Sequence, residues 1–143
     1  MVHALHEAGR VLLPGSLLVD LRPLLDRWPI EVASAGASPE VGRATDLPAP
    51  RADDAAAEAA MVEASASGEW LRELGEDFPL FYYWDTPDEM REHIAGDWSD
   101  IIAVEQPVWR ALRSAWAVAG PEARVRLRTK MRITRFRKVA AGS

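Results

Sequence analysis

Four segments of the chain have the residue pattern of helices. They span residues 4–12, 51–67, 86–96 and 106–119. In the first and fourth, apolar residues recur three and four positions apart, so each helix presents one apolar face. The third has the clearest start, because Thr86 supplies a capping hydroxyl, Pro87 takes the first helical position and Glu89 follows three residues after the cap. The pattern predicts four helices separated by segments of a different period.

Strand patterns occupy the segments between these helices. Residues 16–22 form a nearly continuous apolar run, which predicts a strand covered on both faces. Two short β-branched runs at 30–34 and 40–45 flank a glycine- and proline-containing turn and are typical of a hairpin. The chain thus places its first predicted strands before the second helix.

Two longer strands are predicted near the aromatic segment and at the C-terminal end. Residues 70–84 are rich in aromatic side chains, and the stretch 75–79 predicts an interruption of that strand. Residues 124–133 alternate between arginine or lysine and apolar or threonine side chains, the period of a half-exposed strand. The alternation slips after Ile133, which predicts a bulge or the end of the strand.

The order of these elements predicts the fold class. Helix, strand, hairpin, helix, strand, helix, helix and strand indicate an α/β (α+β-like) protein with a small mixed β-sheet flanked by helices. A chain of 143 residues is of ordinary length for one domain. We expect a single domain over residues 1–139 and a disordered tail at 140–143.

Charge is distributed unevenly along the chain. Eight cations and no acid lie in residues 123–138, whereas the remaining nine cations stand against 22 acids, a balance of −13. The eight are Arg124, Arg126, Arg128, Lys130, Arg132, Arg135, Arg137 and Lys138. Such a segment binds phosphates in some proteins and pairs with acidic side chains in others. Because the rest of the chain would repel a polyanion, we favour pairing with the protein's own acids or with a partner's acidic face over nucleic-acid binding.

Several chemistries find no support in the residue pattern. The chain has no cysteine, and His3 and His6 have a spacing that matches no zinc motif, so we expect no metal site. The nine glycines form no G-x-G loop, and no G-x-S-x-G or phosphate-loop motif is present. No stretch approaches the length of a membrane span, so we expect no membrane partner. Because the chain has no cysteine, we favour a cytoplasmic location.

The N-terminal segment resembles a known family. The run Glu7-Ala8-Gly9-Arg10-Val11-Leu12-Leu13-Pro14-Gly15-Ser16-Leu17-Leu18-Val19-Asp20 is similar to the helix, proline-glycine turn and fifth strand of class I S-adenosylmethionine-dependent methyltransferases, except for Ser16, where the family has a second glycine. Residues 78–90, the following helix and the basic strand at 124–138 resemble the C-terminal part of the same Rossmann-like fold.

The resemblance implies a methyltransferase-like half without the N-terminal half that holds the cofactor. We therefore predict no cofactor, unless another chain completes a site for S-adenosylmethionine. Such a half would lack the neighbours that cover the strand near Leu17 to Leu21, which favours a homodimer or a partner chain. The prediction is a self-associating, partner-binding or small-ligand-binding module. The alternatives are a methyltransferase completed by another chain and a nucleic-acid-binding protein.

Two groups of residues are the candidates for a small-molecule site. Asp20 and Arg22 stand at the end of the first predicted strand, where α/β sheets often bind ligands, although a local ion pair would also explain them. Aromatic rings and a carboxylate suit a pocket and equally suit a core. These residues are Tyr82, Tyr83, Trp84 and Asp85. No catalytic residue is predicted.

Overall fold

The computed structural model describes residues 2–24 and 28–140, and the chain forms two compact units. Unit 1 comprises residues 1–24, 52–78 and 131–143, and unit 2 comprises residues 25–51 and 79–130. The boundaries therefore fall within long elements, so that the helix at residues 48–66 and the strands at 70–84 and 124–138 each supply residues to both units. Of the tail predicted at 140–143, all but Ala140 lies outside the described residues.

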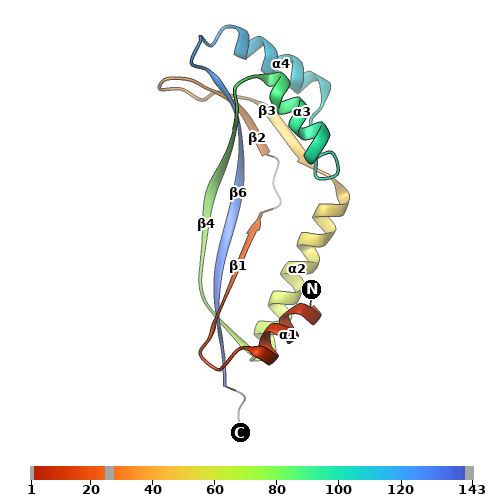
Figure 1. Ribbon diagram of the computed structural model, residues 1–143, viewed down its shortest axis with the longest axis vertical. Helices are drawn as coiled ribbons and strands as arrows, with labels where there is room; N and C mark the ends of the chain where they lie inside the picture. Colours follow the sequence, from red (N-terminus) through yellow and green to blue (C-terminus); the bar gives the residue numbers. More distant parts are fainter. Residues whose placement is uncertain (1, 25–27, 141–143) are drawn as a thin grey trace. The chain divides into compact units, whose positions relative to one another are not determined.

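Six strands form the sheet in the described part of the chain (Figure 1). They are β1 (Leu17–Pro23), β2 (Trp28–Ala33), β3 (Glu40–Asp46), β4 (Trp70–Trp84), β5 (Ile102–Ala103) and β6 (Arg124–Lys138). Their order is β1-β6-β2-β3-β5, and β4 also pairs with β6. The pairings of β6 with β1 and β2, and of β3 with β2 and β5, are antiparallel. The prediction of a mixed sheet is wrong, because β2 turns tightly into β3 and β6 runs against both β1 and β2.

The four predicted helices are present. They are α1 (Val2–Val11), α2 (Pro48–Ala66), α3 (Pro87–Asp97) and α4 (Gln106–Ala117). The cap of α3 forms as the sequence predicts, with Thr86 Oγ1 accepting from the Glu89 N–H at 3.1 Å. The carboxylate of Glu89 accepts in turn from the Asp85 N–H at 2.9 Å. These contacts satisfy backbone donors at the start of the helix and fix where α3 begins.

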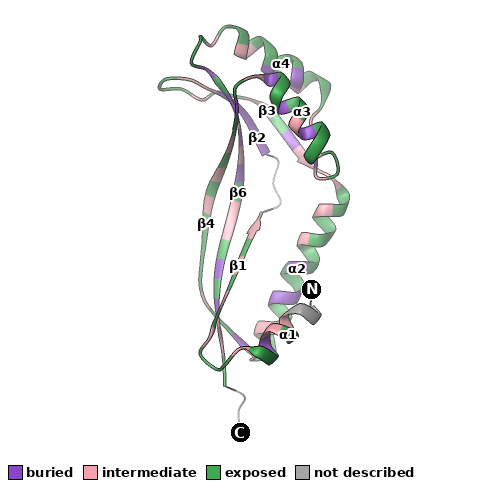
Figure 2. Ribbon diagram, viewed as in Figure 1, coloured by how far each residue is buried: buried purple, intermediate pink, exposed green. Residues whose placement is uncertain are grey.

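In unit 1, β1 pairs with the C-terminal part of β6, from Leu17 opposite Arg137 to Pro23 opposite Met131. Its core consists of three buried side chains from α2, β4 and β6, and partly buried residues of α1, α2 and β1 pack against them. The three are Met61, Trp70 and Phe136. The expectation that both faces of β1 are covered is wrong: β1 alternates between exposed and half-buried residues, whereas β2 is buried along almost its whole length (Figure 2).

In unit 2, the hairpin of β2 and β3 and the start of β6 pack beneath α3 and α4. The core includes Ile30, Met90, Leu112 and Leu127, all almost fully buried. The turn between β2 and β3 contains Gly36, whose φ of 82° lies in the left-handed region that glycine adopts without strain. The hairpin predicted for this segment is confirmed, and it brings Glu31 of β2 beside β6.

Both long strands run further than predicted. β4 is continuous through the stretch 75–79, because it pairs with β6 on one edge and Pro79 then needs no ladder hydrogen bond on the other. β6 continues past Ile133 to Lys138. The slip in alternation is real, since odd-numbered residues are buried up to Thr129 and even-numbered ones from Thr134 on, but it does not end the strand.

Candidate functional site

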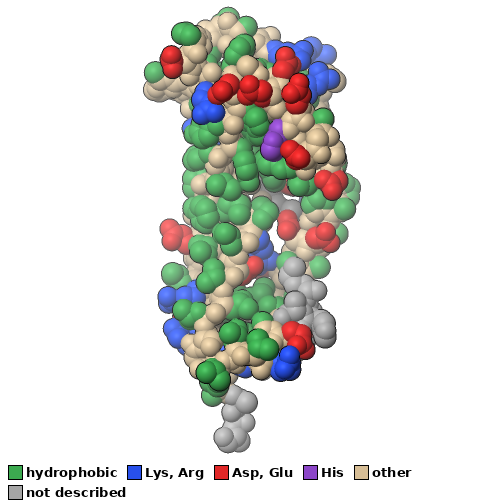
Figure 3. Space-filling model, viewed as in Figure 1, with side chains coloured by type: hydrophobic (Ala, Val, Ile, Leu, Met, Phe, Trp, Pro, Cys, Tyr) green, Lys and Arg blue, Asp and Glu red, His purple; other side chains and the backbone are tan. Residues whose placement is uncertain are grey.

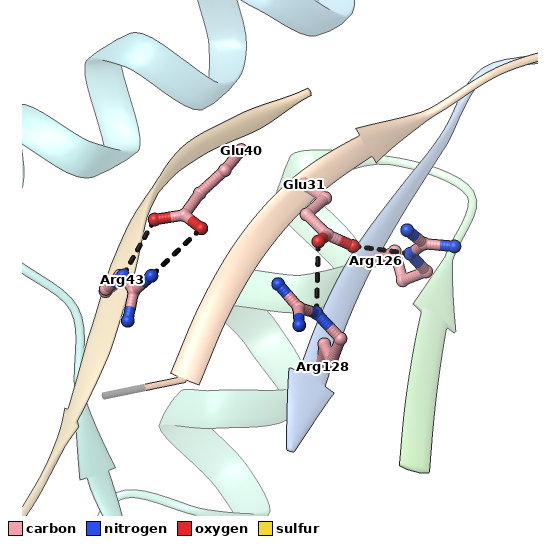
Figure 4. Close-up of polar contacts among 5 residues, drawn as sticks. All are labelled: Glu31, Glu40, Arg43, Arg126 and Arg128. Carbon is pink, nitrogen blue, oxygen red and sulfur yellow. Dashed lines mark hydrogen bonds and ion pairs between the residues drawn. The ribbon is translucent and has the colours of Figure 1, made fainter. Parts of the chain in front are cut away.

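The arginines of β6 that lie in unit 2 are neutralised by acids of the same unit. Glu31 is only 4% exposed, and its carboxylate accepts from Arg126 Nε at 2.6 Å and from Arg128 Nε at 3.2 Å (Figure 4). The antiparallel register places Glu31 directly opposite Arg126, which brings the two charges together. Arg124 Nε lies 2.8 Å from the carboxylate of Asp85. Burial disfavours the charged form of Arg126, but hydrogen bonds with Tyr83 and Glu31 outweigh burial and raise its pKa.

The same pairing continues along β6 in unit 1. Glu73 of β4 lies 2.8 Å from Arg135 and also binds Arg137. The hydrogen bond from Arg137 is the main reason that the pKa of Glu73 is lowered. Arg132 donates twice to Asp77, at 2.7 and 3.1 Å, and this contact is the largest cause of its raised pKa.

These contacts give the basic strand a structural role. Cations that already hold carboxylates are less available to phosphates. Nucleic-acid binding relies on protein cations that neutralise phosphates and so release the counterions condensed on the nucleic acid. Lys138 contacts backbone instead, donating to the carbonyl oxygens of Gly9 and of Leu12, the latter at 2.7 Å. The internal pairing favoured from the charge pattern is what the structure shows for Arg124, Arg126, Arg128, Arg132, Arg135 and Arg137.

The aromatic candidates divide between the two faces of β4 in unit 2. Trp84 is buried and Tyr82 is partly buried, and both rings contact Trp98 edge-on, with centroids 6.0 and 4.7 Å away. Trp98 also contacts the rings of Trp28 and His93, so it is the centre of the cluster. These contacts give Tyr82 and Trp84 the packing of core residues.

Tyr83, on the opposite side of the same strand, and Asp85, which directly follows the strand, are both exposed. The guanidinium of Arg124 lies 5.4 Å from the centre of the Tyr83 ring, and that of Arg126 lies 4.7 Å from the centre of the Phe81 ring. Cation–π contacts of this kind contribute about 0.5–1 kcal/mol at exposed sites. They attach the arginines of β6 to β4.

Asp20 and Arg22, the other predicted pair, lie together in unit 1. Arg22 Nε is 3.1 Å from Asp20 Oδ2, and its Nη2 is 2.5 Å from Glu58 of α2. The side chain of Arg22 is only 11% exposed, so its charge depends on these two carboxylates. Asp54 of the same helix has a raised pKa, chiefly because burial disfavours its charged form. The pair is an ion pair, and it lies at the edge of a hollow.

The hollow lies between α2 and the sheet of unit 1. It has a volume of about 500 Å³ including space open to solvent. Helix α2 lines it with Glu58, Met61, Val62 and Ser65, and β6 lines it with Arg132, Thr134 and Phe136. Arg22 and Arg72 complete the lining from β1 and β4. The hollow combines an apolar floor with guanidinium groups, as small-molecule sites do.

Most of these lining residues were not predicted from the sequence, although a signal was present. The four residues of α2 are spaced i, i+3, i+4 and i+7, the spacing of one helical face. Those of β6 are spaced i, i+2 and i+4, the spacing of one face of a strand. That these two faces meet could not be read from either pattern alone.

The opposite face of β1 is an apolar row open to solvent. Leu17 is 47% exposed, Val19 57% and Leu21 56%. They alternate with the half-buried Leu18, Asp20 and Arg22, so they share one face of the strand. In the part of the chain that the structure describes, β1 pairs with β6 alone, which leaves its other edge without a strand. Further hydrophobic side chains reach the surface elsewhere (Figure 3).

The described residues were searched for grouped metal ligands and for membrane-spanning helices. Across residues 2–24 and 28–140, no three His, Cys, Asp or Glu side chains are grouped to hold a metal ion, and the side chains of His3 and His6 lie outside that description. No described helix combines the length and apolar character needed to cross a membrane. The sequence matches no protein-family model, no curated protein and no solved structure.

Proposed function

We propose that this chain is a non-catalytic binding module that pairs with a second copy of itself through β1. The observation that supports the proposal is the row of Leu17, Val19 and Leu21, exposed along a strand whose outer edge is unpaired among the described residues. Unpaired backbone groups next to apolar side chains favour pairing with another strand.

The order of residues in the row suits a second copy. An antiparallel pair with its two-fold axis at Val19 places each Leu17 opposite the Leu21 of the other copy, and Val19 opposite itself. Apolar side chains then meet along the whole exposed face. On the other face, Asp20 and Arg22 remain bound to each other and to Glu58, so pairing leaves no additional charge without a partner.

Sedimentation equilibrium at micromolar concentrations tests this proposal. We expect a dimer for the original chain and a monomer for Val19→Lys, because two lysines would face each other at the axis. Leu17→Lys tests the same row at a second position by the same measurement. Val118→Lys is the control, since Val118 is 86% exposed in unit 2 and lies outside β1, and this variant is expected to remain a dimer. A monomeric original chain, or a dimeric, folded Val19→Lys variant, would overturn the proposal.

A second candidate follows from the methyltransferase resemblance. The strand that resembles the family's fifth strand is β1, and its open edge is where a half that carries the cofactor loop would pair. Under this hypothesis, another chain supplies the cofactor loop and the complex binds S-adenosylmethionine. Calorimetry with this chain alone is then expected to show no binding of S-adenosylmethionine. A cofactor-binding chain that binds the original chain is expected not to bind the Val19→Lys variant. Binding of S-adenosylmethionine by this chain alone would contradict the hypothesis of a separate cofactor half.

A further inference from the structure

We propose that the hollow beneath α2 in unit 1 binds a small monocarboxylate with a short hydrocarbon chain. The lining has two parts with different chemistry, one of guanidinium groups and one of apolar side chains. Its volume of about 500 Å³, which includes space open to solvent, suits a small organic acid and not a macromolecule.

The charge available to a ligand comes from Arg72. Of the other two arginines in the lining, Arg22 is held by Asp20 and Glu58, and Arg132 is held by two hydrogen bonds to Asp77. Among the described residues, Arg72 has no carboxylate partner. A guanidinium group forms paired, charge-assisted hydrogen bonds with a carboxylate, so Arg72 is the group that an entering carboxylate would meet.

Gly75 leaves room for this guanidinium. A Cβ atom built on Gly75 would lie only 2.9 Å from Arg72 Nη2 and 3.6 Å from Thr134 Oγ1. The absence of a side chain at residue 75 therefore lets Arg72 lie across β4 towards the lining residue Thr134. Any larger residue would move the guanidinium away from this position.

The rest of the hollow is suited to a hydrocarbon chain. Met61 of α2 and Phe136 of β6 are almost fully buried, and Val62 of α2 also lines the hollow. Burying a methylene group against such side chains contributes about 0.8 kcal/mol relative to water, so even a short chain adds to the affinity.

The acids around the hollow select a monoanion. Glu58 lines it, and Asp54 on the same helix lies close enough to Arg22 of the lining to interact with its charge. A dianion such as phosphate would bring a second negative charge near these groups and would be repelled more strongly than a monocarboxylate. A carboxylate needs only the one guanidinium that is not already held.

A titration with hexanoate followed by NMR tests the proposal. We expect shifts in the Met61 methyl and the Arg72 Nε–H signals, weaker binding of hexan-1-ol, which lacks the charge, and no shifts with inorganic phosphate. Arg72→Gln is expected to weaken hexanoate binding about tenfold or more, the loss of one charge-assisted interaction. Gly75→Ala moves the guanidinium and is expected to weaken binding while the chain stays folded.

Arg110→Gln is the matched control, because Arg110 is an exposed arginine of α4 in unit 2 and is not in the lining. It is expected to bind hexanoate as the original chain does. Absence of hexanoate binding by the folded chain overturns the proposal. So does equal affinity of Arg72→Gln and the original chain, or phosphate binding that competes with hexanoate at Arg72.

Discussion

Arg126 Nε on β6 lies 2.6 Å from Glu31 Oε2 on β2, and the two residues stand directly opposite each other in the antiparallel register. Glu31 is almost fully buried and also holds Arg128, so one carboxylate satisfies two cations of the basic strand. Removing one member of such a group leaves the remaining charges without compensation. The basic strand therefore depends on acids far away in the sequence.

Replacing Glu31 tests this dependence. We expect Glu31→Ala to lower the free energy of unfolding by about 3 kcal/mol, because Arg126 and Arg128 lose a buried partner. Urea unfolding followed by circular dichroism measures the change. Glu40→Ala is the matched control from the neighbouring strand, since the Glu40–Arg43 ion pair at 2.7 Å is exposed and is expected to contribute less than about 1 kcal/mol. Equal losses for the two variants would show that Glu31 has no special role.

Glu73 predicts a pH dependence of stability. Its pKa in the folded chain is lowered, chiefly by the hydrogen bond from Arg137. The stability that it contributes is therefore present in full above its pKa in the unfolded chain, about 4.3, and is lost as the pH falls through the lower folded value. Thermal unfolding measured between neutral and acidic pH should show a smaller loss for Glu73→Gln than for the original chain. Identical pH profiles would contradict this assignment.

The aromatic cluster is expected to behave as core. Trp84→Ala should lower the free energy of unfolding by about 3–5 kcal/mol, because it removes a large buried side chain. Tyr83→Ala, on the exposed side of the same strand, should lower it by only about 1 kcal/mol through loss of the contact with Arg124. Similar effects of the two substitutions in urea unfolding would show that the two faces of β4 are not distinguished in this way.

Duplex DNA is expected to bind weakly, with little dependence on salt, because the arginines of β6 already hold carboxylates. A gel shift at low and moderate salt measures this. Glu73→Gln removes the carboxylate that Arg135 and Arg137 share and should therefore strengthen the shift at low salt. Tight, steeply salt-dependent binding by the original chain would contradict the structural role of the basic strand.

Local signals predicted the helices and the hairpin well. The cap at Thr86 fixed the start of α3, and the alternation after Arg124 identified β6. The faces of the strands were predicted less well, because an apolar run such as that of β1 does not reveal what covers it. The break expected at Gly75 and Pro79 was wrong because pairing with β6 overrides local preference.

Long-range pairs explain why the candidate site was only partly predicted. Asp20 and Arg22 are close in sequence and could be singled out together, but Glu58 and Arg72 reach the same hollow from other elements. Likewise, Glu31 and Arg126 are separated by 95 residues, and only the register of β2 on β6 brings them together. Charge composition showed that the cations needed partners and could not show which acids they would bind.

Hydrogen exchange at the β1 amides tests the central claim, pairing through this strand, most directly. Amides that point away from β6 have no strand partner among the described residues, so they should exchange quickly in dilute solution. If two copies pair with their axis at Val19, protection at Val19 and Leu21 will increase with protein concentration, and Val19→Lys will abolish the increase. Exchange at these amides that is the same at low and high concentration would contradict the account.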